Sequence, residues 1–338
     1  MKDLVFIQAC PDDSYYIWQT HAWLESLRKL GKSDQAINCI FIPAGREKNI
    51  KWKILEKEYP ESVFFYQEDT DQISKLLGIY TPILRPYILM KYWEANPDMK
   101  DKAVFYCDND TLFTETFNVD HLKDDDICYL SNTNSYINAN YFDSKTKDVL
   151  PEKKEEYAKR DILQETTGLV GITREIAVKN NNNSGGAQYL LKNIDKDFWN
   201  ECITSVLRIR LSLQKVNKEF FESENKGFQS WCADMWAILW NLWKIEKETK
   251  VVTEMDFSWS SDSIFRVEQT GIFHNAGIVS EKQGEIPVFY KGKYHAGLNP
   301  FEDSYLDFLY TNDLNKTLAN SYYVKALVDL KVKYNLKY

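Results

Sequence analysis

Short apolar runs alternate with helical patterns along the first part of the chain. The runs are rich in branched and aromatic residues, as buried strands are, and they comprise residues 4–9, 38–43 and 62–66. Between them lie an amphipathic helix over residues 16–30 and a short charged helix over residues 51–59. Strands that alternate with helices predict an α/β fold, in which helices flank a mostly parallel central sheet.

The alternation continues downstream in a less regular form. Residues 103–107 carry no charge and are expected to form the central strand, directly after a well-packed helix over residues 82–93. Further strands are expected at residues 127–130, 168–172 and 251–255, and further helices from Ala187, over residues 229–247 and near the C-terminus. The four tryptophans within residues 229–247 indicate a helix that belongs mostly to the core.

The chain is long enough for one large domain or two. We assign residues 1–300 to one domain and residues 301–338 to a helical C-terminal extension. Residues 132–160 are polar with few branched apolar side chains, which indicates an excursion over the surface. Connections of this length often serve as lids or binding loops.

Two carboxylates follow the central strand, one residue apart. Side chains alternate along an extended chain, so Asp108 and Asp110 are expected on one side and Asn109 on the other. Open α/β sheets bind ligands at the carboxyl ends of their strands. Mg²⁺-like ions take one or two carboxylates and share phosphate oxygens with a substrate, so the pair predicts a metal–phosphate site. A solvated turn is the alternative interpretation, because Asp and Asn favour turns.

Other candidate ligand contacts lie at element ends. Gln8 lies where the first strand runs into a polar loop, and Arg85 lies near a helix start, where the backbone favours anions. Arg85 is either a phosphate contact or a capping residue. Gly185 and Gly186 let a ligand approach the backbone, or belong to a flexible linker.

Two further residues stand in apolar surroundings. Asp234 interrupts the tryptophan-rich helix and is either a buried, hydrogen-bonded carboxylate or a catalytic or sugar-binding one. His274 follows an apolar pair, a position like that of Asp108, although a structural histidine is the common alternative.

Composition narrows the class of protein. The 338 residues are 44% hydrophobic, and no stretch approaches the roughly 20 apolar residues of a membrane span. We expect a soluble cytoplasmic protein without a signal peptide. The net charge of −8 disfavours a nucleic-acid-binding surface, and four histidines with scattered cysteines argue against a zinc site.

Arg85, the run VFYCDNDTLF and the later HNAG form an ordered set that resembles nucleotide-sugar glycosyltransferases of the GT-A fold, and most closely glycosyltransferase family 8, the glycogenin and galactosyltransferase type. The resemblance implies that Arg85 contacts the nucleotide. It implies that Asp108 and Asp110 hold Mn²⁺, or Mg²⁺, with the donor's ribose and diphosphate. It also implies that His274 is the third metal ligand, with Gly277 beside it.

The sequence departs from the family in two places. The family's lysine follows its histidine sooner, so Lys282, Lys291 or neither contacts the diphosphate. The donor-sugar loop carries other residues, and its alignment by position puts Gln188 near the reacting carbon. Asp234 resembles in position the family's later acid at the sugar site.

The resemblance implies transfer of a hexose or pentose from a nucleotide-diphosphate sugar to a hydroxyl acceptor, with retention. The acceptor is a saccharide, a protein or a hydroxymethylated base of phage DNA. Residues 132–160 are the candidate acceptor or lid region. The alternatives are a nucleotidyltransferase-type metal–phosphate enzyme and a non-catalytic carbohydrate-binding protein.

Overall fold

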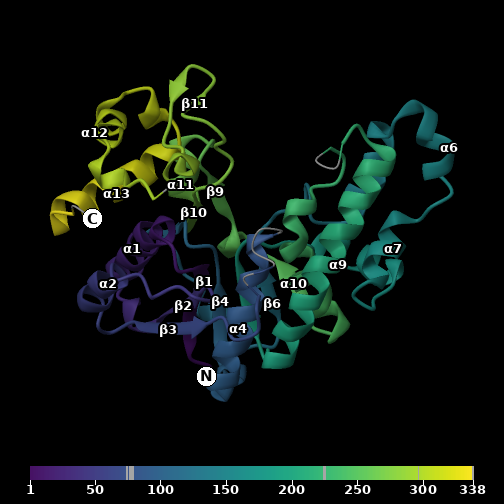
Figure 1. Cartoon of the computed structure of the whole chain (residues 1–338), viewed down its shortest axis with the longest axis horizontal. Helices are drawn as coiled ribbons and strands as arrows, with labels where there is room; N and C mark the ends of the chain where they lie inside the picture. Colours follow the sequence, from purple (N-terminus) through teal and green to yellow (C-terminus); the bar gives the residue numbers. More distant parts are fainter. Residues whose placement is uncertain (74, 76–79, 224–225, 296, 337–338) are drawn as a thin grey trace. The chain divides into compact units, whose positions relative to one another are not determined.

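The chain has a mixed α/β fold built on a seven-stranded, mostly parallel sheet with helices beside it (Figure 1). The computed structural model describes residues 1–338 except 74, 76–79, 224–225, 296 and 337–338. The strand order is β3-β2-β1-β4-β7-β6-β8, and β6–β7 is an antiparallel pair. The strands are β1 (Leu4–Pro11), β2 (Ala36–Ile42), β3 (Val63–Glu68), β4 (Ala103–Tyr106), β6 (Cys128–Leu130), β7 (Tyr189–Lys192) and β8 (Thr249–Val251). The predicted fold class is confirmed.

Two compact units make up the chain, and each combines distant segments. Unit 1 comprises residues 1–3, 75–104 and 122–252, and unit 2 comprises residues 4–74, 105–121 and 253–338. The segment predicted as a C-terminal extension therefore belongs to unit 2. The boundary at residue 300 stays a prediction.

Unit 2 packs its C-terminal helices against its first helix. Trp18 of α1 (Ser14–Lys29) lies against the rings of Phe289 and Tyr323, and Phe273 stacks on Tyr323. A second sheet of three strands, β5-β10-β9, belongs to the same unit. Its elements besides β1–β3 are α1 (Ser14–Lys29), α2 (Trp52–Glu58), β5 (Thr111–Phe113), β9 (Phe257–Trp259), α11 (Ile264–Gln269), β10 (Ile272–His274), β11 (Lys282–Gln283), β12 (Ile286–Pro287), α12 (Ser304–Thr311) and α13 (Asn320–Tyr334).

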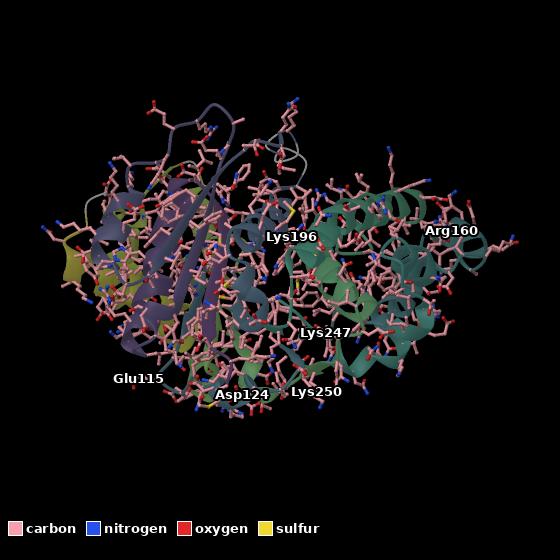
Figure 2. All side chains as sticks on the ribbon, turned by 90° about the horizontal axis from the view of Figure 1, so that it is seen from below. Glu115, Asp124, Arg160, Lys196, Lys247 and Lys250 are labelled. Carbon is pink, nitrogen blue, oxygen red and sulfur yellow. The ribbon has the colours of Figure 1, made fainter. Side chains whose placement is uncertain are left out.

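Unit 1 is built around three packed helices. These are α4 (Leu84–Ala95), α9 (Lys196–Phe220) and α10 (Ala233–Lys244), and side chains fill the space around them (Figure 2). Three of the four tryptophans predicted as core are buried, whereas Trp231 is 57% exposed. Residues 132–160 contribute α5 (Ala139–Ser144) and α6 (Lys154–Tyr157), followed by α7 (Ile162–Gly168) and α8 (Arg174–Lys179).

Three sequence predictions of secondary structure are wrong. The strand expected at residues 168–172 is the end of α7 and a turn in which Gly171 has φ +93°. The helix expected from Ala187 is the strand β7, because Ala187 adopts φ +72° and the next residues pair with β6. The strand at residues 251–255 ends at Val251 and continues as a 3₁₀ turn. Short apolar runs fit a strand or a buried helix equally well, so only tertiary pairing decides.

None of the helices in the described part of the chain combines the length and the apolar character that crossing a membrane requires.

His21 predicts a measurable pH dependence of stability. Burial lowers its pKa to about 3; Glu25 opposes this shift, while Lys333 and Arg28 add to it. In the unfolded chain a histidine titrates near pH 6.5. Between these values the unfolded chain binds more protons, so stability falls as the pH falls, by up to about 1.4 kcal/mol per pH unit.

Below pH 6.5, the free energy of unfolding is therefore expected to fall less steeply with falling pH in His21→Gln than in the wild type. Urea unfolding at pH 7 and pH 5 measures this difference. His121→Gln is the control, because the His121 side chain is 55% exposed. An unchanged pH slope in His21→Gln would contradict the assignment.

Candidate active site

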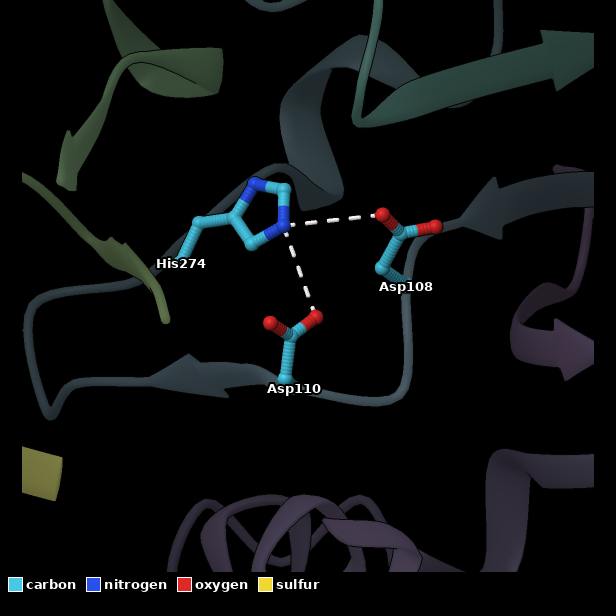
Figure 3. A group of neighbouring side chains, drawn as sticks. All are labelled: Asp108, Asp110 and His274. Atoms are coloured by element: carbon cyan, nitrogen blue, oxygen red, sulfur yellow. Dashed lines mark ion pairs between the residues drawn. The ribbon is translucent and has the colours of Figure 1, made fainter. Parts of the chain in front are cut away.

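Two carboxylates and an imidazole converge in unit 2, as the sequence predicted (Figure 3). Asp108 lies just beyond β4, and Asp110 immediately precedes β5. His274 is the last residue of β10, which pairs antiparallel with β5 so that His274 lies opposite Thr111. The strand pairing therefore delivers a residue from far along the chain to the Asp-x-Asp turn.

The three side chains are close and mostly shielded. His274 Nε2 lies 3.5 Å from Asp108 Oδ2 and 3.4 Å from Asp110 Oδ1. The side chains of Asp110 and His274 are only 4% and 6% exposed, while that of Asp108 is 23% exposed. A solvated turn would leave both carboxylates in water, so the turn interpretation fails for Asp110.

Neighbouring groups hold the imidazole and the turn in place. The Trp259 ring stacks on His274 with ring centroids 5.8 Å apart and an interplanar angle of 19°. The Asn275 amide donates to the Asp110 carbonyl over 3.0 Å, and the Thr111 amide donates to the Asp108 carbonyl over 3.2 Å. Both sides of the site are thus fixed by backbone hydrogen bonds.

A cation already compensates the buried carboxylate. Lys291 Nζ donates a hydrogen bond to Asp110 Oδ2. Burial raises the pKa of Asp110, but the charges of Lys291 and His274 outweigh burial and hold it below its usual value. Burial lowers the pKa of His274, and the carboxylates of Asp110 and Asp108 overcome this and raise it to about 9. The two carboxylates are thus paired with two basic groups, Lys291 and His274.

The donor set fits a divalent cation. One ligand atom from each of Asp108, Asp110 and His274 can be chosen so that all lie within 4.8 Å of one another. Carboxylates suit Mg²⁺ and Mn²⁺, and imidazole extends the choice toward transition metals. Three such ligands would leave coordination positions for a substrate.

The remaining unit 2 candidates have distinct places. Gln8 is fully buried, and its amide donates to Thr20 Oγ1 over 3.1 Å and to Asn38 Oδ1 over 2.5 Å. Lys282 lies on the exposed two-residue strand β11. Of the two lysines that the sequence left open, Lys291 is the one that reaches the carboxylates.

Arg85 and Asp234 form an ion pair within unit 1. Arg85 is the second residue of α4 and Asp234 the second residue of α10, and their side chains meet at 3.2 Å. The Tyr80 hydroxyl lies 2.9 Å from Asp234 Oδ1. Burial and the Asp234 charge hold the pKa of Tyr80 well above its usual value, so Tyr80 stays a hydrogen-bond donor. The sequence analysis predicted both residues as site candidates but did not predict that they form an ion pair.

The glycines before β7 have a packing role. A Cβ at Gly185 would lie 2.2 Å from the Ser131 carbonyl oxygen, and one at Gly186 would lie 2.4 Å from the Tyr189 hydroxyl oxygen. Close chain packing therefore explains both glycines without a ligand. Gln188 is fully buried, and its backbone N–H donates to Ser131 Oγ over 3.1 Å.

Comparison with known proteins leaves the family open. No family model and no curated protein matches the chain. A solved structure described as the apo form of the bifunctional glycosyltransferase WbbM is similar over 96% of this chain at 10% sequence identity, with a TM-score of 0.46. The chain spans about half the length of that structure, 51%. Similarity at this level establishes no family.

Sequence reasoning missed several neighbours of the site. Trp259 braces His274, and the Tyr15 ring stacks on His295 at 3.9 Å between centroids. Burial and the nearby Asp110 charge raise the pKa of Tyr15, which keeps its hydroxyl protonated. An aromatic residue in the loop after the first strand was the available signal for Tyr15. No sequence signal pairs it with His295.

Proposed function

We propose that the protein is a metal-dependent glycosyltransferase of the GT-A type. It transfers a hexose or pentose from a nucleotide-diphosphate sugar to a hydroxyl acceptor, with retention of configuration. The observation that carries the proposal is the shielded cluster of Asp108, Asp110 and His274. Lys291 pairs with the Asp110 carboxylate of this cluster. The cluster agrees with the resemblance carried by the order Arg85, Asp-x-Asp and late histidine.

The residues of the cluster have two proposed roles, metal binding and stabilisation of the leaving group. Asp108, Asp110 and His274 would hold Mn²⁺, or Mg²⁺, which when bound supplies positive charge to the diphosphate leaving group. Lys291 brings a further cation to the same place. Its ammonium stabilises negative charge that grows as the sugar–oxygen bond breaks, and this interaction strengthens toward the transition state.

Shielding makes these charges effective. The side chains of Asp110 and His274 are almost completely shielded from water. Electrostatic interactions are stronger in such a shielded place than at the protein surface. The hydrogen bonds at Asp108 and Asp110 pre-set the site, so little reorganisation is needed when the substrate binds.

The donor contacts in unit 1 remain part of the proposal. Arg85 would contact the nucleotide, and Gln188 and Asp234 would lie near the reacting sugar. Gly185 and Gly186 would line the donor-sugar loop. The Arg85–Asp234 pair supports a defined polar site, because each charge already has a partner that fixes its orientation.

A panel of nucleotide sugars tests the function. The protein is incubated with UDP-glucose, UDP-galactose, UDP-N-acetylglucosamine, UDP-xylose and GDP-mannose in the presence of Mn²⁺. We expect slow release of nucleoside diphosphate from at least one donor, and loss of this release on chelation. Mass spectrometry of mixtures with saccharide, peptide and hydroxymethylated DNA acceptors then identifies the product.

The same assay separates the alternatives. Release of pyrophosphate from a nucleoside triphosphate would indicate that the protein is a nucleotidyltransferase and not a glycosyltransferase. Saccharide binding that is indifferent to metal, with no donor turnover, would indicate a carbohydrate-binding protein. Either result would overturn the proposal.

A further inference from the structure

Trp231 differs from the other tryptophans of the chain in its exposure to solvent. Of the ten tryptophans, all of which the structure describes, Trp231 alone is exposed, at 57%. Most of the others lie in the two cores. An exposed indole costs solvation free energy, so it calls for a binding role more than an exposed leucine does.

A second aromatic side chain completes a patch within unit 1. The half-buried Tyr136 ring lies 6.3 Å from the Trp231 ring, at an interplanar angle of 32°. Tyr136 comes from residues 132–160, which the sequence marked as a candidate acceptor or lid region. We call Trp231 and Tyr136 the aromatic patch.

Hydrogen bonds fix the backbone on both sides of the patch. The Tyr136 amide donates to the Thr133 carbonyl over 3.1 Å, which forms a turn. The Tyr80 hydroxyl lies within hydrogen-bond distance of the Trp231 carbonyl oxygen. The Arg210 guanidinium sits over the Tyr80 ring, 4.3 Å from its centroid. The backbone that carries the patch is therefore fixed, and a ligand that binds there loses little free energy to ordering the backbone.

Charged groups lie next to the patch. Asp234 follows Trp231 by three residues, and residues so spaced in a helical turn project to the same side. The Tyr80 hydroxyl reaches both the Trp231 carbonyl oxygen and the Asp234 carboxylate, and Arg85 pairs with that carboxylate. The Asp234 carboxylate and its partner Arg85 thus lie near the backbone of Trp231.

We propose that the aromatic patch, with the Asp234 carboxylate near it, binds the pyranose ring of a saccharide acceptor. A pyranose has a face of C–H bonds that packs on an aromatic ring, and an edge of hydroxyls that hydrogen-bonds to charged groups. Apolar surface with a few oriented polar groups is the general composition of small-molecule sites. The inference rests on the proposed function and narrows its acceptor to a saccharide.

Saccharide binding tests the patch directly. The probes are methyl pyranosides of glucose, galactose, mannose and N-acetylglucosamine, and the disaccharides lactose and cellobiose. Saturation-transfer NMR and calorimetry measure their binding to the full chain. We expect at least one probe to bind, and Trp231→Ala to weaken that binding about tenfold, the effect of losing one good contact. Trp231→Phe should recover part of it.

Phe265→Ala is the matched control, because Phe265 is 65% exposed and belongs to unit 2. Tyr136→Leu is the second variant, and circular dichroism verifies that each variant folds. Absence of binding by every probe, or equal binding by wild type and Trp231→Ala, overturns the inference. So does a patch that serves self-association, in which Trp231→Ala changes the oligomeric state and leaves saccharide binding unchanged.

This result and that of the donor panel are separable. Failure of the donor panel with intact, Trp231-dependent saccharide binding would remove the glycosyltransferase proposal and keep the saccharide site. Donor turnover without Trp231-dependent saccharide binding would keep the glycosyltransferase proposal and remove the saccharide site.

Discussion

Asp110→Asn is expected to lower donor turnover by about 10³-fold, equivalent to about 4 kcal/mol of transition-state stabilisation. The substitution keeps the size of the side chain and removes its charge. Asp110 is the most shielded of the three proposed ligands, and both His274 and Lys291 contact it. Loss of this one charge therefore disturbs the metal ligand set and the lysine together.

Metal affinity provides a readout that does not depend on activity. Titration calorimetry with Mn²⁺ should show at least about tenfold weaker binding in Asp110→Asn, as expected when a ligand charge is lost. Asp120→Asn is the matched control, because Asp120 also belongs to unit 2 and pairs with a lysine, Lys32, at 2.9 Å. Equal Mn²⁺ affinity in wild type and Asp110→Asn would remove Asp110 from the metal site.

Lys291→Ala is expected to lower kcat about 10²-fold, the loss seen when one preorganised electrostatic contact is removed from a transition state. Its effect on the metal has the opposite sign. In the structure Lys291 donates to Asp110, so its positive charge opposes a cation at the same carboxylate. Mn²⁺ affinity measured without a donor is therefore expected to be equal or higher in the variant.

Lys282→Ala is the matched control for Lys291. Lys282 has the same charge and lies nine residues earlier, on the exposed strand β11. Its removal should leave both kcat and Mn²⁺ affinity unchanged. A larger loss of kcat in Lys282→Ala than in Lys291→Ala would reverse the assignment.

The candidate metal ligands were predictable because each has a local sequence signal. Asp108 and Asp110 follow an uncharged apolar run, and His274 follows an apolar pair, so both places have the form of a strand that ends in a polar residue. The structure confirms that the three converge. The sequence left Lys282, Lys291 or neither as the diphosphate contact, because the loop after His274 departs from the family spacing and carries no periodic pattern.

The elements around residues 168–192 show where sequence reasoning fails. The run Gly168–Ile172 is apolar and short, and Ala187–Ile194 has the composition of a helix. Pairing with β6 and the positive φ of Ala187 override the helix preference of the second segment. The first segment instead forms the end of α7 and a turn at Gly171. Gly185 and Gly186 were predicted to let a ligand approach, and that role stays a prediction; the structure adds that Ser131 and Tyr189 leave no room for a side chain at either position.

The sequence by itself determined the α/β class, the central strand and the Asp-x-Asp turn with its distant histidine. These features depend on periodicity and on residues at strand ends, which local chemistry dictates. The tertiary structure alone decided that Lys291 reaches Asp110, that Arg85 pairs with Asp234, and that Trp231 is exposed beside Tyr136. Each is a contact between segments far apart in the chain, and no local pattern encodes which partner a side chain will meet.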